Sequence, residues 1–275
     1  MKFAVSEIAL MMSNVSSMGF AHAATREEIA RREYQALPLL GTLNARHLTL
    51  HTFMAENPTF FVEVLCEAFL LANRDKEQAP QPSPEARARA QVAYRLLAVM
   101  HTIPGAAEDG MLDEIKLMRW IEQVRKLAGE RDRIGVADSK IGAVLAHALV
   151  DPEDKAWPQR AVRRVIENLD AKDVERGPMI ERYNMRWGYS KALFEGGAQE
   201  SVLADQYRGW AACSQPRWPK MARVLNAIAS HWEGMPTARI YGLNRINLNR
   251  AASNAPRPKF PDDGQSDSRT DTVSG

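Results

Sequence analysis

The feature that most constrains the fold is a helix-start signal that recurs along the chain ahead of apolar residues with helical spacing. Each signal is a Ser, Thr, Asn or Asp, whose side chain can accept a hydrogen bond from a free N–H at a helix N-terminus. Two of them precede Pro, which loses nothing at the first helical position because the N–H it lacks has no partner there. The five signals are Thr25, Asn57, Ser83, Asp113 and Asp138. This recurrence predicts a succession of helices.

The residues that follow these signals carry one apolar face. Behind Asn57, for example, apolar side chains recur three or four positions apart at Phe61, Val64, Leu65 and Ala68, as on one side of an α-helix. Alternation of apolar and polar residues, which predicts strands, is not sustained anywhere between hairpin-type turns. We therefore predict an all-α fold of roughly ten helices, built as a multi-helix bundle or a short solenoid-like stack of antiparallel helix pairs.

Breaks in this pattern suggest where the folded part ends. Residues 74–84 are polar and rich in Pro, which predicts a loop and a possible sub-boundary. From Arg250 onward the chain is mostly Pro, Asp, Ser, Arg and Thr, and such a segment cannot bury enough apolar surface to offset its ordering entropy. We predict one helical domain over residues 1–249 and a disordered tail over residues 250–275. Within the domain, Gly177–Pro178 marks a possible kink in a helix.

Composition limits the classes of protein to which the chain can belong. Of its 275 residues, 45% are hydrophobic, and the formal net charge is +2, so binding to nucleic acid or to an anionic membrane would need a local basic patch. No stretch approaches the ~18 apolar residues of a membrane span. Two isolated cysteines, Cys66 and Cys213, make neither a disulfide framework nor a zinc site. We expect a cytoplasmic protein with no membrane association.

The N-terminal residues offer one alternative to that localisation. Lys2, an apolar run and Ala21-His22-Ala23 imitate a secretory signal with its cleavage site. Glu7 interrupts the apolar run, and a helix with one polar face over residues 3–23 explains the same sequence. Export is therefore the lesser alternative.

Three motifs are candidates for a metal, anion or catalytic site. His47 and His51 have the spacing of two metal ligands on one helix. Residues 48–50 lack the Glu of a zinc-protease motif, so we expect two partly exposed histidines instead. Gly196-Gly197 precedes a predicted helix and could bind an anion, yet Glu200 would repel phosphate. Neither cysteine lies at a helix N-terminus, where the helix dipole would activate it. We predict no metal, no cofactor and no catalytic residues, with the glycine pair in a structural turn.

The region from Arg176 to Trp232 holds four of the six Trp residues and is the predicted centre of the module. Aromatic and basic residues are frequent anchors of protein interfaces, although packing between helices would explain the same residues. The candidate partner-binding residues are Arg182, Tyr183, Arg186, Trp187, Tyr189 and Lys191. Those given a structural role are Gly196, Gly197, Trp157, Pro158, Trp210, Trp218, Pro219 and Trp232. We expect Trp210 and Trp232 to be largely buried.

Two Trp-Pro pairs give a weak internal echo, since Trp157-Pro158 and Trp218-Pro219 each precede an amphipathic helix. A second feature is a basic, Asn-rich stretch after Pro236 that could contact nucleic acid phosphates. Its candidate contacts are Arg239, Arg245 and Arg250. A solvated tail is the favoured explanation of these arginines.

The order of elements from Phe53 to Trp232 resembles the C-terminal region of large, uncharacterised bacterial proteins. The segments that carry the resemblance are residues 57–64, 141–146, 157–158, 175–177, 183–184, 194–200 and 217–219. It implies an α-helical module of a larger protein, linked to defence against phage or mobile elements, and it implies no catalytic residues. The chain would then be a detached or truncated form of such a module.

Together these patterns predict a non-catalytic helical interaction or scaffold module. Its partner would be another protein or the remainder of a larger system. A nucleic-acid-associated helical domain is the first alternative. A hydrolase-type enzyme is the second, because residues far apart in the sequence can meet in the fold.

Overall fold

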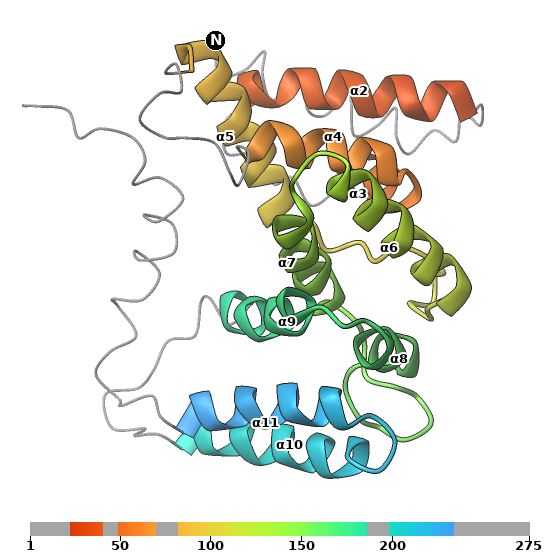
Figure 1. The fold of residues 1–275 in the computed structure, drawn as a ribbon, viewed down its shortest axis with the longest axis vertical. Helices are drawn as coiled ribbons and strands as arrows, with labels where there is room; N and C mark the ends of the chain where they lie inside the picture. The colour runs from red at the N-terminus through yellow and green to blue at the C-terminus, as the bar shows by residue number, and fades with distance from the viewer. Residues whose placement is uncertain (1–22, 41–48, 70–81, 186–197, 234–275) are drawn as a thin grey trace, which may run out of the picture. The chain divides into compact units, whose positions relative to one another are not determined.

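The protein is all-α in the part of the chain that the computed structural model describes, which is residues 23–40, 49–69, 82–185 and 198–233 (Figure 1). These residues form helices and no strand, and their one β-like feature is an isolated bridge between Ala106 and Leu112. The all-α prediction is confirmed. The helices in the described residues are α2 (Ala23–Leu40), α3 (Thr49–Glu56), α4 (Pro58–Ala68), α5 (Pro84–Ala98), α6 (Glu114–Gly129), α7 (Ile134–Leu145), α8 (Arg160–Asn168), α9 (Lys172–Asn184), α10 (Ala198–Ser214) and α11 (Pro219–Glu233).

Three of the predicted start signals cap helices as expected. The Asn57 side chain accepts a hydrogen bond from the N–H of Phe60 at 3.0 Å, and Ser83 accepts one from Ala86 at 3.2 Å. Asp113 accepts two, from Ile115 and Lys116, at 3.0 and 3.1 Å. Each bond satisfies an N–H that has no partner within the helix.

The start predicted at Asp138 is wrong. Helix α7 begins four residues earlier, at Ile134, and Asp138 lies buried inside it. Its carboxylate binds the guanidinium of Arg125 on α6 at 2.9 and 3.4 Å. Asp138 therefore makes a contact between two helices instead of capping one. Helix α2 begins at Ala23, two residues before the signal at Thr25.

The helices pack mainly on others that are close to them in the sequence. Helix α4 packs on α3, α5 and α6, while α6 packs on α7 and α8. Further along the chain α7 packs on α9, α9 and α8 pack on α11, and α10 and α11 lie side by side (Figure 1). Such local packing is typical of stacked helix pairs. The described residues all belong to one compact unit. The predicted boundary at residue 249 and the predicted tail lie outside the described residues.

Aromatic side chains fill the core between α3, α4 and α6. Phe61 of α4 and Trp120 of α6 meet edge to face, with ring centroids 4.9 Å apart. The indole N–H of Trp120 donates to the carbonyl of Met54 at 3.1 Å, so this buried polar group is satisfied. The three helices are thus tied by apolar contact and by one buried hydrogen bond.

Helices α7 and α9 touch through their backbones. A Cβ placed on Gly177 would lie 2.6 Å from Cα and C of Gly142, and one on Gly142 would lie 2.4 Å from the carbonyl oxygen of Val174. That carbonyl has no helical N–H partner, because the residue four positions on is Pro178. Helix α9 nevertheless continues through Pro178 as one helix. The Gly177–Pro178 pair thus forms the contact point between two helices.

Candidate functional site

Aromatic side chains of α10 and of the connection that precedes α8 pack together beside Arg182 of α9. The guanidinium of Arg182 lies 4.8 Å from the ring centroid of Trp157, and its Nε donates to the Tyr207 hydroxyl at 2.6 Å. Tyr207 is also in contact with Trp157 and Trp210, at ring-centroid distances of 6.0 and 5.2 Å. Burial raises the pKa of Tyr207 above its usual value, so it remains a neutral hydrogen-bonding group at physiological pH. These contacts lock three parts of the chain together.

A buried arginine organises the connection before α8. The side chain of Arg163 is fully buried, and its two terminal nitrogens donate to the carboxylate of Asp154 at 2.6 and 2.8 Å. It also donates to the carbonyls of Pro158 and Ala156, at 2.6 and 2.5 Å. The hydrogen bonds from Arg163 hold the pKa of Asp154 below its usual value. A guanidinium with this many acceptors is satisfied despite its burial, and it fixes the shape of the loop.

The two Trp-Pro pairs belong to helices that pack on each other. Trp157-Pro158 precedes α8 and Trp218-Pro219 opens α11. Arg163 of α8 lies over the Trp218 ring, 4.9 Å from its centroid. The start of α11 is held by Glu167 of α8, which accepts a hydrogen bond from the N–H of Lys220 at 2.9 Å. The two Trp-Pro pairs therefore lie at the starts of two helices, α8 and α11, that pack on each other.

The two candidate partner-binding residues that the structure describes make internal contacts. Arg182 belongs to the junction with Trp157 and Tyr207, and Tyr183 stacks on His231 of α11 with ring centroids 4.0 Å apart. Burial raises the pKa of Tyr183 and lowers that of His231. The other candidates lie outside the described residues: Arg186, Trp187, Tyr189, Lys191, Gly196, Gly197, Arg239, Arg245 and Arg250.

The tryptophans given a structural role differ in how deeply they are buried. Trp232 is 4% exposed, and Trp157 and Trp218 are buried as well. Trp210 is intermediate in exposure, so it is less buried than the other three. Its indole N–H donates to the carbonyl of Lys155 at 3.1 Å. This hydrogen bond joins α10 to the connection that precedes α8.

Three histidines that are far apart in the sequence lie next to one another in the fold. The ring centroid of His101 lies 5.1 Å from that of His51 and 6.3 Å from that of His147. His147 Nε2 lies 3.4 Å from a carboxylate oxygen of Glu181 on α9. His51 is buried, contrary to the expectation of a partly exposed side chain, and His47 lies outside the described residues. Within those residues, no group of three or more His, Cys, Asp or Glu side chains is arranged to hold a metal ion.

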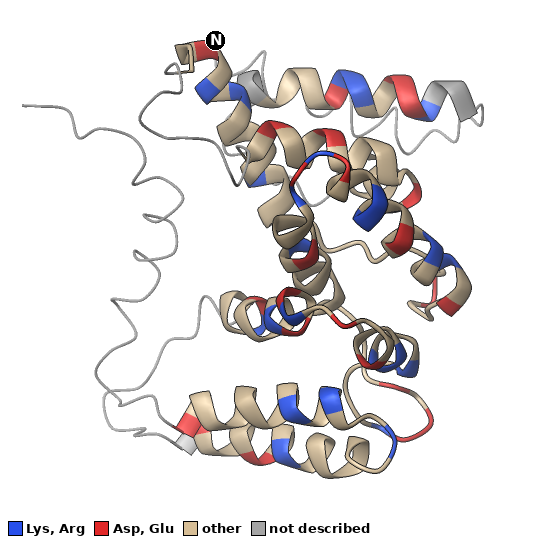
Figure 2. Ribbon diagram, in the orientation of Figure 1, with Lys and Arg blue, Asp and Glu red and all other residues tan. Residues whose placement is uncertain are grey.

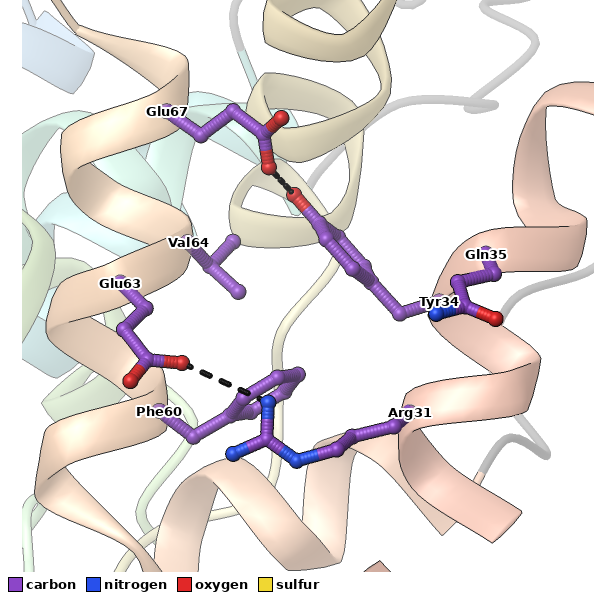
Figure 3. Close-up of a pocket in the computed structure, with 7 residues that line it drawn as sticks. All are labelled: Arg31, Tyr34, Gln35, Phe60, Glu63, Val64 and Glu67. Atoms are coloured by element: carbon purple, nitrogen blue, oxygen red, sulfur yellow. Dashed lines mark hydrogen bonds and ion pairs between the residues drawn. The ribbon is translucent and has the colours of Figure 1, made fainter. Parts of the chain in front are cut away.

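A hollow of about 150 Å³ lies between α2 and α4 (Figure 3). The residues that line it are Arg31, Tyr34, Gln35, Phe60, Glu63, Val64 and Glu67. The Tyr34 hydroxyl donates to Glu67, and a nitrogen of Arg31 lies 3.7 Å from Glu63. Burial and the contact with Glu67 raise the pKa of Tyr34 above its usual value. Because the charged side chains pair with one another across the hollow, we interpret it as a joint between two helices.

Exposed apolar side chains gather on two connections, residues 99–113 between α5 and α6 and residues 146–159 between α7 and α8. Met111, Leu149 and Val150 are 42%, 54% and 42% exposed. The two connections touch, since a Cβ placed on Gly110 would lie 2.6 Å from Cδ1 of Leu149. We call these three side chains the apolar platform.

The buried side chain of Gln159 holds the two connections together. Its amide nitrogen donates to the carbonyl of Gly110 at 2.9 Å, and its amide oxygen accepts from the N–H of Leu112 at 3.1 Å. The backbone N–H of Gln159 donates to the carbonyl of Leu149 at 3.1 Å. With its donors and acceptor engaged, Gln159 fixes the backbone under the apolar platform. No local sequence pattern predicts this contact, because Gln159 and Gly110 are 49 positions apart.

Several basic side chains on the C-terminal helices are paired with acidic ones. Figure 2 shows Lys and Arg interspersed with Asp and Glu along these helices. Among the described residues of this region, such pairs include Arg160–Glu153, Arg163–Asp154, Arg164–Glu114, Arg208–Glu233 and Arg223–Glu175. Such pairing offsets the positive charge that a phosphate backbone would contact.

Two observations concern the chain's surroundings. In the described part of the chain, none of the helices combines the length and apolar character that a membrane crossing requires. Cys66 and Cys213 are both free thiols.

Comparison of the chain with protein-family models, with curated proteins and with solved structures gives no match.

Proposed function

We propose that the chain is a non-catalytic α-helical interaction module that binds another protein through a preformed surface. The observation that carries this proposal is the apolar platform. Three large apolar side chains stand exposed on connections whose backbone is fixed by hydrogen bonds with the buried side chain of Gln159. A surface already fixed in one conformation loses little entropy on binding.

Several polar side chains outside the apolar platform support the same interpretation, because their contacts stabilise the fold. Arg163 and Asp154 shape a loop, Arg182 joins the aromatic junction, and His147 contacts Glu181 on a neighbouring helix. Stacked helix pairs commonly present extended surfaces to partners. The resemblance to the C-terminal region of larger bacterial proteins accords with a module that acts beside other parts of a system. We place the protein in the cytoplasm, where two free thiols persist.

The experiment that tests this function is the reconstitution of a complex. The tagged chain is expressed in its own host, a co-purifying protein is identified, and both components are purified separately and mixed. We expect a complex of fixed stoichiometry in analytical ultracentrifugation. Binding to DNA and RNA is measured in parallel by fluorescence anisotropy at low and high salt. Steeply salt-dependent nucleic acid binding, with no protein complex reconstituted, would overturn the proposal.

A further inference from the structure

The two connections that carry the apolar platform are acidic in composition. The two connections that carry it, residues 99–113 and 146–159, contain six acidic residues, one Lys and no Arg. The acidic residues are Glu108, Asp109, Asp113, Asp151, Glu153 and Asp154. The acidic surplus lies in the same two loops as the exposed apolar side chains.

Part of this acidic charge is neutralised within the protein. Asp154 pairs with Arg163, Glu153 with Arg160, and Asp113 lies 3.6 Å from Lys116. Glu108 and Asp109 are exposed and form no ion pair with the described residues. They lie three and two positions before Met111, and Asp109 accepts a hydrogen bond from the N–H of Met111 at 2.9 Å. Negative charge therefore remains beside the apolar platform.

We infer that the apolar platform binds a partner segment whose apolar side chains are flanked by Lys or Arg. This inference rests on the proposed interaction function and adds the chemistry of the partner. Apolar side chains of the partner would cover Met111, Leu149 and Val150. Its basic side chains would lie beside Glu108 and Asp109, where opposite charge raises the association rate and selects the orientation of the partner.

The test uses the full-length chain and a short synthetic peptide with Leu at helical spacing and Lys between. A matched peptide carries Glu in place of every Lys. Binding is measured by fluorescence anisotropy. We expect the Lys peptide to bind, the Glu peptide not to bind, and the affinity for the Lys peptide to fall with added salt. Failure of the Lys peptide to bind, or equal binding of both peptides, would overturn the partner chemistry.

Two substitutions locate the binding surface. Leu149→Glu places a charge on the apolar platform and Glu108→Lys reverses its flanking charge, so each should weaken binding of the Lys peptide about tenfold. The matched controls are Val202→Glu, at an exposed apolar position of α10, and Glu130→Lys, at the opposite end of α6. Circular dichroism and thermal melting verify that all four variants fold. If Leu149→Glu binds as tightly as Val202→Glu, the assigned surface is wrong.

The same assay distinguishes two other occupants of the apolar platform, the chain's own C-terminal segment and a second copy of the chain. Replacing Arg239, Arg245 and Arg250 with Glu should leave peptide binding unchanged; tighter binding would show that the chain's own C-terminal segment occupies the surface. Self-association that Leu149→Glu abolishes would identify a second copy as the occupant. Either result overturns the inference of a separate partner. The proposed interaction function has a separate test, and it is refuted if no protein complex can be reconstituted.

Discussion

Replacing Gly177 with Ala tests the contact between α7 and α9. A Cβ there would lie 2.6 Å from two backbone carbons of Gly142 and 2.7 Å from the nitrogen of Ala143. Carbon atoms in contact prefer about 3.5–4.0 Å, so the two helices must separate by about 1 Å. Backbone atoms have no alternative rotamer that would relieve the contact. The separation therefore opens the packing along both helices.

The expected effect is a net loss of stability. Overpacking costs about 1–3 kcal/mol and occasionally more, while Ala is favoured over Gly inside a helix by roughly 0.5–1 kcal/mol. Because the obstructing atoms at Gly177 are backbone, we expect a cost at the upper end of that range and a net loss of about 2 kcal/mol. For a chain of this size that corresponds to a fall in Tm of about 4–8 °C.

The assay is thermal and urea unfolding followed by circular dichroism, with Gly209→Ala as the matched control. Gly209 lies in α10, and a Cβ there meets nothing within 4 Å, so the control should gain roughly 0.5–1 kcal/mol. Gly142→Ala should destabilise as Gly177→Ala does, and the double variant should cost less than the sum, because either change separates the same pair. A stabilising Gly177→Ala would refute the backbone contact.

Three further predictions concern the aromatic junction and the buried arginine. Trp157→Ala should lower the free energy of unfolding by about 3–5 kcal/mol, as for a core Trp, and Trp210→Ala by clearly less, because Trp210 is only partly buried; equal losses in urea titrations would contradict the different burial. Arg182→Ala should destabilise the chain more than Arg176→Ala does, because Arg182 bonds Tyr207 whereas Arg176 is exposed; a comparison of Tm values checks this. The pKa of Asp154 is lower in the folded chain than its unfolded value of about 3.9, so its stabilising effect is present above that value and is lost as the pH falls through the folded pKa. Urea titrations from pH 5 to pH 3 should therefore show a smaller loss of stability for Asp154→Asn than for the unmodified chain, and parallel curves would exclude this role.

The helical class and several helix starts were predictable because their causes are local. Asn57, Ser83 and Asp113 bond to N–H groups two or three residues away, so the signal and its partner lie in one short stretch. Asp138 has the same residue type, but its partner is Arg125 of another helix. Residue type alone does not distinguish a helix cap from a contact between helices.

The candidate surface was not predictable because it depends on contacts across the fold. Met111 and Leu149 are ordinary apolar residues in the sequence, and their exposure follows from the way Gln159 joins two distant connections. The Arg-aromatic region indicated a cluster of large side chains, and the cluster exists around Trp157 and Tyr207. Whether such residues face a partner or a neighbouring helix is decided by packing, and Arg182 makes its described contacts within the protein.

The central claim is that the apolar platform is held in one conformation before any partner binds. NMR-detected hydrogen exchange of the free protein tests this directly at the N–H of Leu112, which donates to Gln159. We predict exchange at least about a hundredfold slower than in an unstructured peptide. This protection should be lost in Gln159→Leu and retained in Gln123→Leu, whose site is exposed on α6. Exchange of Leu112 at the rate of an unstructured peptide would contradict the account.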